Sequence, residues 1–181
     1  VSLLNYAYET MLRAFSMTED STRVIRALQI MADRTGIYGM LGGQVVDVEM
    51  TGKQMSGDQL HFVYENKTGA LIEASMMIGA VLAGATEDEL KQVEMIASDI
   101  GLAFQIQDDL LDILGDSAVL GKPVCSDEEN GKVTYVTIHG LEESKKDVAE
   151  ISKRAVTRLD QLPYKNEFLD ELILELVNRK K

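Results

Sequence analysis

Three aspartates stand in the otherwise apolar stretch FQIQDDLLDILGD, which runs from Phe104 to Asp116. On a helix, Asp108 and Asp112 lie one turn apart on the same face, and Gln105 precedes them by about one turn. Like charges at this spacing repel, and burial raises the cost further. Carboxylates brought together in this way suit a hard cation such as Mg²⁺, with water and substrate phosphates completing its shell. A solvated acidic patch near a helix end is the alternative, and the apolar residues leading into the aspartates disfavour it.

Lysines near these aspartates are candidates for binding phosphate groups. Lys67 and Thr68 open an otherwise apolar segment, and Lys122 and Lys132 lie in the charged loop that follows the aspartates. A lysine ammonium is a compact point charge that suits phosphate oxygens. Taken alone, Lys67 is equally consistent with a surface lysine, and the small residues that follow it indicate close packing between helices.

Two better-known phosphate and metal motifs do not fit. The stretch GDSAVLGKP has five residues between its glycines where a P-loop has four, and Pro123 stands where that motif has Ser or Thr. The overlapping stretch DILGDSAVLGKP lacks the acid at the third position of an EF-hand and the glutamate at the twelfth. His61 and His139 have no second ligand at metal-binding spacing, and Cys125 has no companion for metal or triad chemistry. We interpret the two histidines as structural and Cys125 as inert.

Composition excludes several classes of protein. Thirty acidic and eighteen basic residues give a net charge of -12, which argues against nucleic-acid binding. The single cysteine excludes an intrachain disulfide and fits a reducing compartment, so we expect a cytoplasmic location. The longest nearly uncharged run, from Ala74 to Ala85, is too short to span a bilayer. An acidic protein that binds an anionic substrate needs positive charge at the binding site, supplied either by metal ions or by a few lysines.

The chain is predicted to be all-α, because no segment alternates apolar and polar residues over the length of a strand. Thr86 and Glu89 have capping-box spacing and open a long helix with Gly115 at its C-cap. The inward stripe of that helix is predicted to be Leu90, Val93, Ala97, Ile100, Phe104, Asp108 and Leu111. The other predicted helices cover about 3–16, 19–34 with Thr18 as N-cap, part of 36–50, 58–84, 134–140, 142–162 and 166–179, with a loop over 115–133.

Four stretches together resemble one family. KTGALI, FQIQDDLLD followed by LGD, GKPVCSDEENGKVTY and GMLGGQVVDVE, in their order and spacing, resemble the trans-isoprenyl diphosphate synthases (polyprenyl synthetases). Within that family the chain is most similar to the bacterial farnesyl diphosphate synthases, or geranyltranstransferases. The resemblance covers essentially the whole chain. It implies a helical bundle around a central cavity, a homodimer, and Mg²⁺-assisted ionisation of an allylic diphosphate that isopentenyl diphosphate then attacks.

The same resemblance assigns roles to individual residues. Asp108 would be the principal Mg²⁺ ligand, with Asp109 and Asp112 in support. Phosphate-binding and cavity residues would surround them. Lys67 and Lys122 would hold the allylic diphosphate with Lys132 nearby, Thr68 and Gln105 would offer oxygens near the developing cation, Gln44 and Asp47 would lie beside the cavity, and Phe104 would pack near isopentenyl diphosphate.

The chain departs from the family pattern in three respects. Tyr64 stands where the family often has a histidine, and Cys125 replaces a common glycine. The first aspartate-rich motif of the family precedes a segment similar to SLLNYAYE, which here begins at Ser2. We therefore expect residues 1–181 to be the C-terminal portion of a single synthase domain, without its N-terminal helices and inactive alone.

Alternatives to a farnesyl diphosphate synthase remain. A geranylgeranyl or longer-chain synthase has the same motifs. A non-catalytic subunit of a prenyl synthase would usually have lost the aspartates or lysines, and a terpene cyclase generally lacks the paired lysines. An acidic helical protein without an active site would have to carry four ordered motifs by chance.

Overall fold

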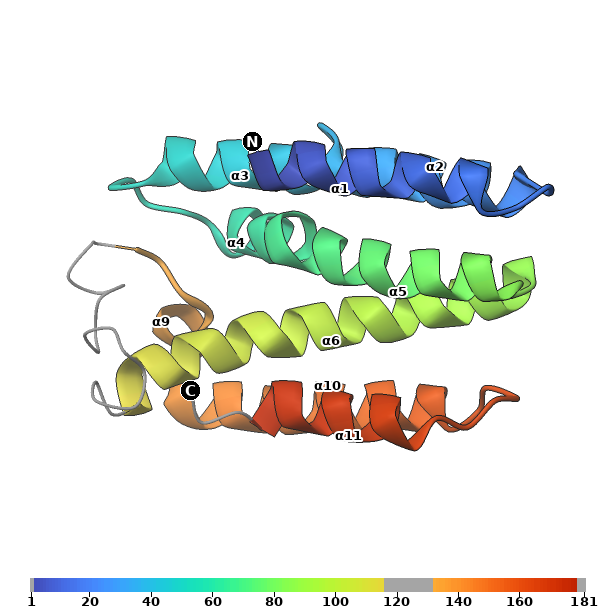
Figure 1. Ribbon diagram of the computed structural model, residues 1–181. Coiled ribbons are helices and arrows are strands. Elements are labelled where there is room, and N and C mark those ends of the chain that lie inside the picture. The colour runs from blue at the N-terminus through green and yellow to red at the C-terminus, as the bar shows by residue number, and fades with distance from the viewer. Residues whose placement is uncertain (1, 116–131, 179–181) are drawn as a thin grey trace.

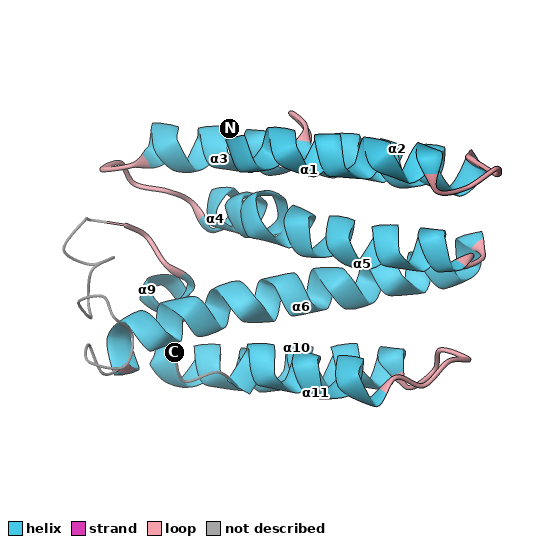
Figure 2. Ribbon diagram, in the orientation of Figure 1, coloured by secondary structure: helices cyan, strands magenta, loops and turns pink. Residues whose placement is uncertain are grey.

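A computed structural model describes residues 2–115 and 132–178, and this part of the chain is helical with no strand, as predicted (Figures 1 and 2). The loop prediction for 116–131, which includes Lys122 and Cys125, lies outside the described residues. Within the described ranges, every helix is too short or too polar to cross a bilayer. The elements are α1 (Ser2–Leu12), the 3-10 helix η1 (Arg13–Ser16), α2 (Thr22–Thr35), α3 (Met40–Met50), α4 (Gly57–Val63), the π-helix η2 (Tyr64–Gly69), α5 (Ala70–Ala83), α6 (Glu87–Leu114), α9 (Tyr135–His139), α10 (Leu141–Leu159) and α11 (Glu167–Asn178).

The long helix α6 runs through the middle of the bundle (Figure 1). It packs against α5 and η2 on one side and against α10, α11 and α9 on the other, while α2 covers α5 and α3 covers η2. Three apolar clusters follow its length. Leu90 packs with residues of α2 and α5, Ile96 and Ile100 pack with α10 and α11, and Ile106 packs with α9 and α10. These apolar contacts along α6 therefore fix the positions of the neighbouring helices relative to the end of α6 that carries the aspartates.

The predicted boundaries of α6 are confirmed, and its inward stripe is partly revised. Thr86 and Glu89 form the expected capping box, in which the Thr86 amide donates to Glu89 Oε2 at 2.7 Å, and Gly115 is the C-cap residue. The buried carboxylates near the end are those of Asp109 and Asp112, whereas Asp108 is only half-buried. Sequence periodicity placed Asp108 on the inward stripe. In the structure, Asp108 lines a pocket instead of lying in the core.

One other predicted helix begins differently, and the next lies within its predicted range. Helix α2 starts at Thr22 instead of residue 19, with Ser21 as its N-cap residue in place of Thr18. The carboxylate of Asp20 accepts a hydrogen bond from the Thr22 amide at 3.0 Å, so a turn of polar residues precedes the helix. Helix α3 occupies the later part of the predicted range 36–50, and α2 ends at Gly36 as expected.

The predicted helix over 58–84 is interrupted by a π-helix. Residues Tyr64–Gly69 widen the helix by one π turn between α4 and α5. Glycines let this segment lie close to its neighbours. A Cβ on Gly43 of α3 would lie 2.5 Å from the Lys67 backbone nitrogen, and one on Gly101 of α6 would lie 2.8 Å from the Gly69 Cα. Single-turn π segments are rare and occur often at functional sites.

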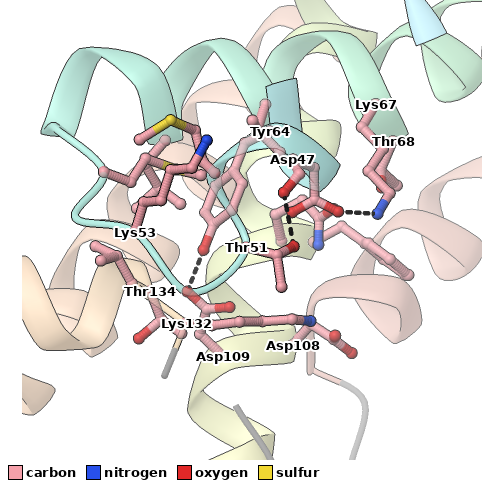
Figure 3. A pocket seen from close by; sticks show the side chains of 17 residues that line it. Asp47, Thr51, Lys53, Tyr64, Lys67, Thr68, Asp108, Asp109, Lys132 and Thr134 are labelled. Carbon is pink, nitrogen blue, oxygen red and sulfur yellow. Dashed lines mark hydrogen bonds and ion pairs between the residues drawn. The ribbon is translucent and has the colours of Figure 1, made fainter. Parts of the chain in front are cut away.

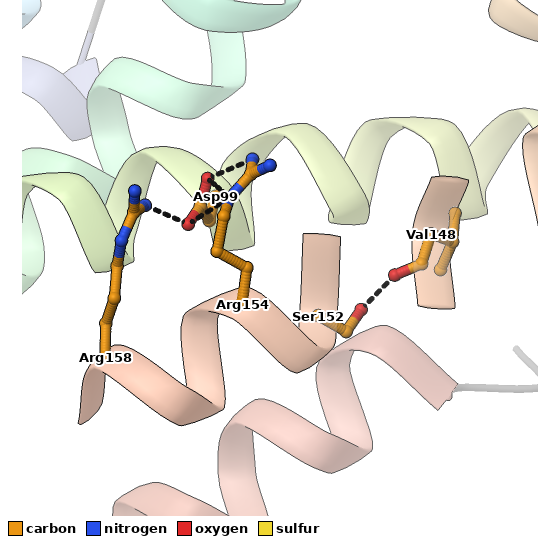
Figure 4. A network of polar contacts seen from close by, with 5 residues as sticks. All are labelled: Asp99, Val148, Ser152, Arg154 and Arg158. Carbon is orange, nitrogen blue, oxygen red and sulfur yellow. Dashed lines mark hydrogen bonds and ion pairs between the residues drawn. The ribbon is translucent and has the colours of Figure 1, made fainter. Parts of the chain in front are cut away.

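A buried carboxylate fixes α10 against α6 (Figure 4). Asp99 of α6 is 7% exposed and accepts hydrogen bonds from two arginines of α10. Arg154 Nη2 lies 2.6 Å from Asp99 Oδ1, and Arg158 donates to Asp99 Oδ2. Breaking a buried, hydrogen-bonded charge pair is costly, so this network stabilises the packing of α10.

Candidate active site

A pocket of about 450 Å³ lies where the last turns of α6 meet α3, α4, η2 and the segment 132–134 (Figure 3). It joins three lysines and three aspartates from separate parts of the chain. The lining residues are Asp47, Met50, Thr51, Lys53, Met55, Leu60, Val63, Tyr64, Lys67, Thr68, Phe104, Gln105, Asp108, Asp109, Lys132, Val133 and Thr134.

Lys67 projects from η2 into this pocket and forms an ion pair with Asp47 of α3. The Lys67 Nζ lies 2.6 Å from Asp47 Oδ2 (Figure 3). The two side chains are 36% and 25% exposed, so the pair is partly screened by solvent. Asp47 therefore holds the Lys67 ammonium at the pocket, and an incoming anion could take the place of Asp47 as its partner.

Asp108 and Lys132 lie on the opposite wall of the pocket. Asp108 is on α6, and Lys132 is in the segment that leads into α9. In Figure 3 the Lys132 side chain extends toward Asp108, and both lie across the pocket from Lys67. Each of these two walls thus carries a lysine and an aspartate.

Asp109 is held by hydrogen bonds at the base of the pocket. Its Oδ2 accepts from the Tyr64 hydroxyl and, at 2.7 Å, from the Tyr135 amide. The Tyr135 amide also lies 3.3 Å from the Tyr64 oxygen, and Tyr64 and Asp109 are each 7% exposed. The Tyr135 hydroxyl donates to Asp147 at 2.8 Å, and burial with this contact raises the pKa of Tyr135 to about 12.

A second, apolar groove adjoins the pocket. It has a volume of about 360 Å³ and shares Thr68 and Phe104 with the charged pocket. Its other lining residues come from α5, α6 and α11 and are Leu71, Ile72, Ser75, Met76, Ile100, Leu169, Leu172, Ile173 and Leu176. A polar head group and an apolar tail could therefore occupy adjacent spaces.

Most residues expected at the site come together here. Lys67, Thr68, Asp47, Phe104, Gln105, Lys132, Asp108 and Asp109 all line the charged pocket. Among the described residues, Gln44 and the buried Asp112 do not line it, and Lys122 lies outside the described ranges. The chemical roles of all these residues stay predictions.

Sequence reasoning missed several lining residues, notably Lys53, Thr51, Tyr64 and Thr134. Lys53 lies between α3 and α4, in a stretch whose glycines indicated only a loop. Tyr64 was noted only as a departure from a family pattern. No local signal shows that its hydroxyl meets a carboxylate 45 residues further along the chain.

The donor set of the pocket fits a hard cation better than a soft one. Carboxylate, hydroxyl and amide oxygens line it, and none of its described lining residues is a histidine or cysteine. Over residues 2–115 and 132–178, no group of three or more His, Cys, Asp or Glu side chains is arranged to hold a metal. Mg²⁺ sites commonly use one or two carboxylates together with substrate phosphates and water. Asp108 fits such a shared site.

The chain is similar to known proteins over most of its length. Residues 3–169 match the family model for polyprenyl synthetase. The chain is 40% identical over 152 residues to farnesyl diphosphate synthase of Escherichia coli, covering 83% of the chain and 50% of that protein. It is 36% identical over 160 residues to geranylgeranyl pyrophosphate synthase of Capsicum annuum, covering 88% of the chain and 43% of that protein.

Solved structures show the same arrangement of helices. Geranyltransferase of Helicobacter pylori, complexed with magnesium and isoprenyl diphosphate, has a TM-score of 0.78 at 28% identity, with 96% of the chain and 56% of that protein covered. An FPP/GFPP synthase of Zymomonas mobilis has a TM-score of 0.80 at 26% identity, with 97% and 58% covered. The chain spans about half the length of the curated relatives that it matches. With a family match over nearly all of the described helices, the chain belongs to the polyprenyl synthetase family.

Proposed function

We propose that this chain forms the part of a prenyltransferase that binds an allylic diphosphate and aids its ionisation, so that isopentenyl diphosphate can condense with it to give farnesyl diphosphate. The observation that carries the proposal is the pairing of two spaces. A pocket with Lys67, Lys132 and Asp108 opens beside an apolar groove, and Thr68 and Phe104 belong to both. An allylic diphosphate has the matching form, with a charged head and a hydrocarbon tail.

The lysines account for binding of the diphosphate head. Lys67 is held by Asp47 at 2.6 Å, and diphosphate oxygens compete for the same ammonium. Lys132 approaches from the opposite wall, so the two lysines can contact different oxygens of one head group. Point charges on both sides would stabilise the negative charge that grows on the leaving diphosphate as the carbon–oxygen bond breaks.

Mg²⁺ is the cation that this oxygen donor set favours, and when bound it would neutralise charge on the leaving group. Asp108 would hold it from the protein side. Thr68 lies where the head and tail spaces meet, and Gln105 lines the charged pocket, so the dipoles of the Thr68 hydroxyl and the Gln105 amide would face the electron-poor allylic carbon. Phe104 would exclude water from that carbon, so that the isopentenyl double bond attacks before water does.

Product length is open between two classes. The relatives include farnesyl and geranylgeranyl synthases at similar identity, 40% and 36%. A geranylgeranyl or longer-chain synthase is therefore the second candidate. Chromatography of the products made by the complete protein from dimethylallyl and isopentenyl diphosphates would separate the two.

Calorimetric titration tests the proposed binding function. The ligand is a non-ionisable geranyl diphosphate analogue, with and without Mg²⁺, and the variants are Lys67→Gln and Asp108→Asn. Removing one charge-assisted contact should weaken binding about tenfold or more. Asp108→Asn should weaken binding of the analogue only when Mg²⁺ is present. Lys91→Gln is the matched control, because that side chain is 70% exposed near the other end of α6. Wild-type binding that is equally tight without Mg²⁺, or that survives Lys67→Gln unchanged, would contradict the proposal.

We also propose a homodimer in the cytoplasm, as the resemblance implies. Leu41, Val45 and Val48 form an exposed apolar stripe along α3, with exposed fractions of 44%, 54% and 60%. A stripe of this kind supports burial against another surface. A second copy of the chain is the partner we propose.

A further inference from the structure

Asp109 occupies the middle position of the aspartate-rich stretch, yet its contacts in this chain are those of a structural anchor. Its Oδ2 accepts two hydrogen bonds, one from the Tyr64 hydroxyl and one from the Tyr135 amide at 2.7 Å. The carboxylate and the tyrosine are each 7% exposed. Withdrawal of Asp109 toward a metal would break both hydrogen bonds, one of them from the hydroxyl of the buried Tyr64, which is unfavourable.

The hydrogen bond of the Tyr135 amide fixes the chain directly after a segment that lines the pocket. Lys132, Val133 and Thr134 line the charged pocket and lead directly into α9. Thr134 is the N-cap of α9 in a capping box with Thr137, which fixes the direction of the chain there. The Tyr135 ring is tied to α10 through Asp147, while its amide is tied to α6 through Asp109. The position of Lys132 therefore depends on an attachment three residues later.

Tyr64 makes this attachment from a segment that also lines the pocket. It opens the π-helix η2, which also carries Lys67 and Thr68 into the pocket. One short segment thus supplies a substrate-facing lysine and the hydroxyl that holds Asp109. Asp109 Oδ2 thus links η2 to the start of α9, and the Tyr135 amide also lies 3.3 Å from the Tyr64 oxygen.

We propose that Tyr64 and Asp109 are positioning residues, whose hydrogen bonds with the Tyr135 amide hold Lys132 at the edge of the pocket. The inference rests on the proposed function for the identity of the ligands. The positioning itself rests on the contacts within the chain.

Three variants of the complete protein that contains this chain separate the two roles. Asp109→Asn keeps a side-chain oxygen that accepts both hydrogen bonds, so the Mg²⁺ concentration for half-maximal activity should stay within about twofold. Asp108→Asn should raise that concentration at least tenfold. Tyr64→Phe should raise the KM for the allylic diphosphate about threefold to tenfold, the effect of one lost hydrogen bond, with kcat and the Mg²⁺ requirement little changed. If Asp109 were a ligand, loss of its Tyr64 partner would instead weaken Mg²⁺ binding about tenfold to a hundredfold.

Two measurements do not require turnover. Inorganic pyrophosphate binding without Mg²⁺ reports on the lysines and should weaken in Tyr64→Phe to the same extent as the KM rises. Hydrogen exchange at the Tyr135 amide should speed up in Tyr64→Phe and Asp109→Ala and stay slow in Asp108→Asn. An Mg²⁺ requirement raised as much by Asp109→Asn as by Asp108→Asn would overturn the inference. So would unchanged pyrophosphate binding and unchanged Tyr135 exchange in Tyr64→Phe, even if thermal stability fell. Absence of prenyl transfer in the wild type would refute the proposed function alone, because the exchange measurement would still test the positioning.

Discussion

Substitution of Gly43 by alanine should displace the segment that carries Lys67. A Cβ at this position would lie 2.5 Å from the Lys67 backbone nitrogen and 2.9 Å from the Asn66 carbonyl carbon. Both are backbone atoms, so no side-chain rotation can relieve the contact. Alanine gains about 1 kcal/mol over glycine in a helix, and overpacking costs about 1–3 kcal/mol. Because the backbone must move, we expect the upper part of that range and a net loss of about 2 kcal/mol.

Gly79→Ala is the matched control for this experiment. Gly79 lies in α5, and a Cβ there would have no heavy atom within 4 Å. Alanine should therefore stabilise the protein by about 1 kcal/mol through helix propensity alone. The same chemical change at two helical glycines should thus differ by about 3 kcal/mol in the free energy of unfolding, measured by urea denaturation.

Binding provides the functional half of the test. A shift of η2 by a few tenths of an ångström moves the Lys67 ammonium away from its place in the pocket, and displacements of about 1 Å can cost a hundredfold in activity. Gly43→Ala should weaken Mg²⁺-dependent binding of the geranyl diphosphate analogue about tenfold, whereas Gly79→Ala should leave it unchanged. Equal stability and equal binding for the two variants would refute the view that close approach at Gly43 positions Lys67.

Three further predictions concern stability and assembly. Asp99→Asn removes the charge that Arg154 and Arg158 share, and because their side chains are 51% and 30% exposed, we expect a discounted loss of about 1–2 kcal/mol in urea denaturation. Asp88→Asn, at a 98% exposed side chain in the first turn of α6, should lower stability clearly less, and equal effects would show that the network adds no stability. Burial raises the pKa of Glu73, so the folded state holds this proton more tightly than the unfolded state, and stability from this group should fall as pH rises above about 4 toward its folded pKa. Glu73→Gln should flatten that slope, and an unchanged pH profile would contradict the assignment. Val45→Asp on the α3 stripe should shift sedimentation of the complete protein from dimer to monomer, whereas Lys91→Gln should leave it dimeric.

Features encoded within one or two turns could be predicted from the sequence. The capping box of Thr86 and Glu89 is a local exchange of hydrogen bonds, so spacing alone identifies it. Helical periodicity likewise predicted an all-α fold and the long helix that ends near Gly115. The convergence of Lys67 with Asp108 came from the family resemblance, since nothing local relates η2 to the end of α6.

Features that depend on distant contacts could not be predicted. A regular helical pattern runs through residues 58–84, and the π-helix arises where Gly43 and Gly101 let two neighbours approach the same turn. In the same way, the spacing of the aspartates gives their relative directions but not which of them are buried, as Asp109 and Asp112 are. For Asp109, the hydrogen-bond partners are Tyr64 and Tyr135, which are distant in the sequence.

Charge balance explains why binding at this pocket should depend on a metal. The described lining residues include three lysines and three aspartates, so the pocket is near neutral in a chain of net charge -12. Asp109 already accepts two hydrogen bonds, and Lys67 is already paired with Asp47. A diphosphate entering alone would have to displace Asp47 and meet Asp108, whereas one arriving with a divalent cation would make Asp108 a ligand instead of a repulsive neighbour. Since charges further than about 8 Å away are screened at physiological salt, the remaining acidity of the chain should have little influence on this local exchange. We therefore predict that diphosphate binding at this near-neutral pocket depends on a divalent cation.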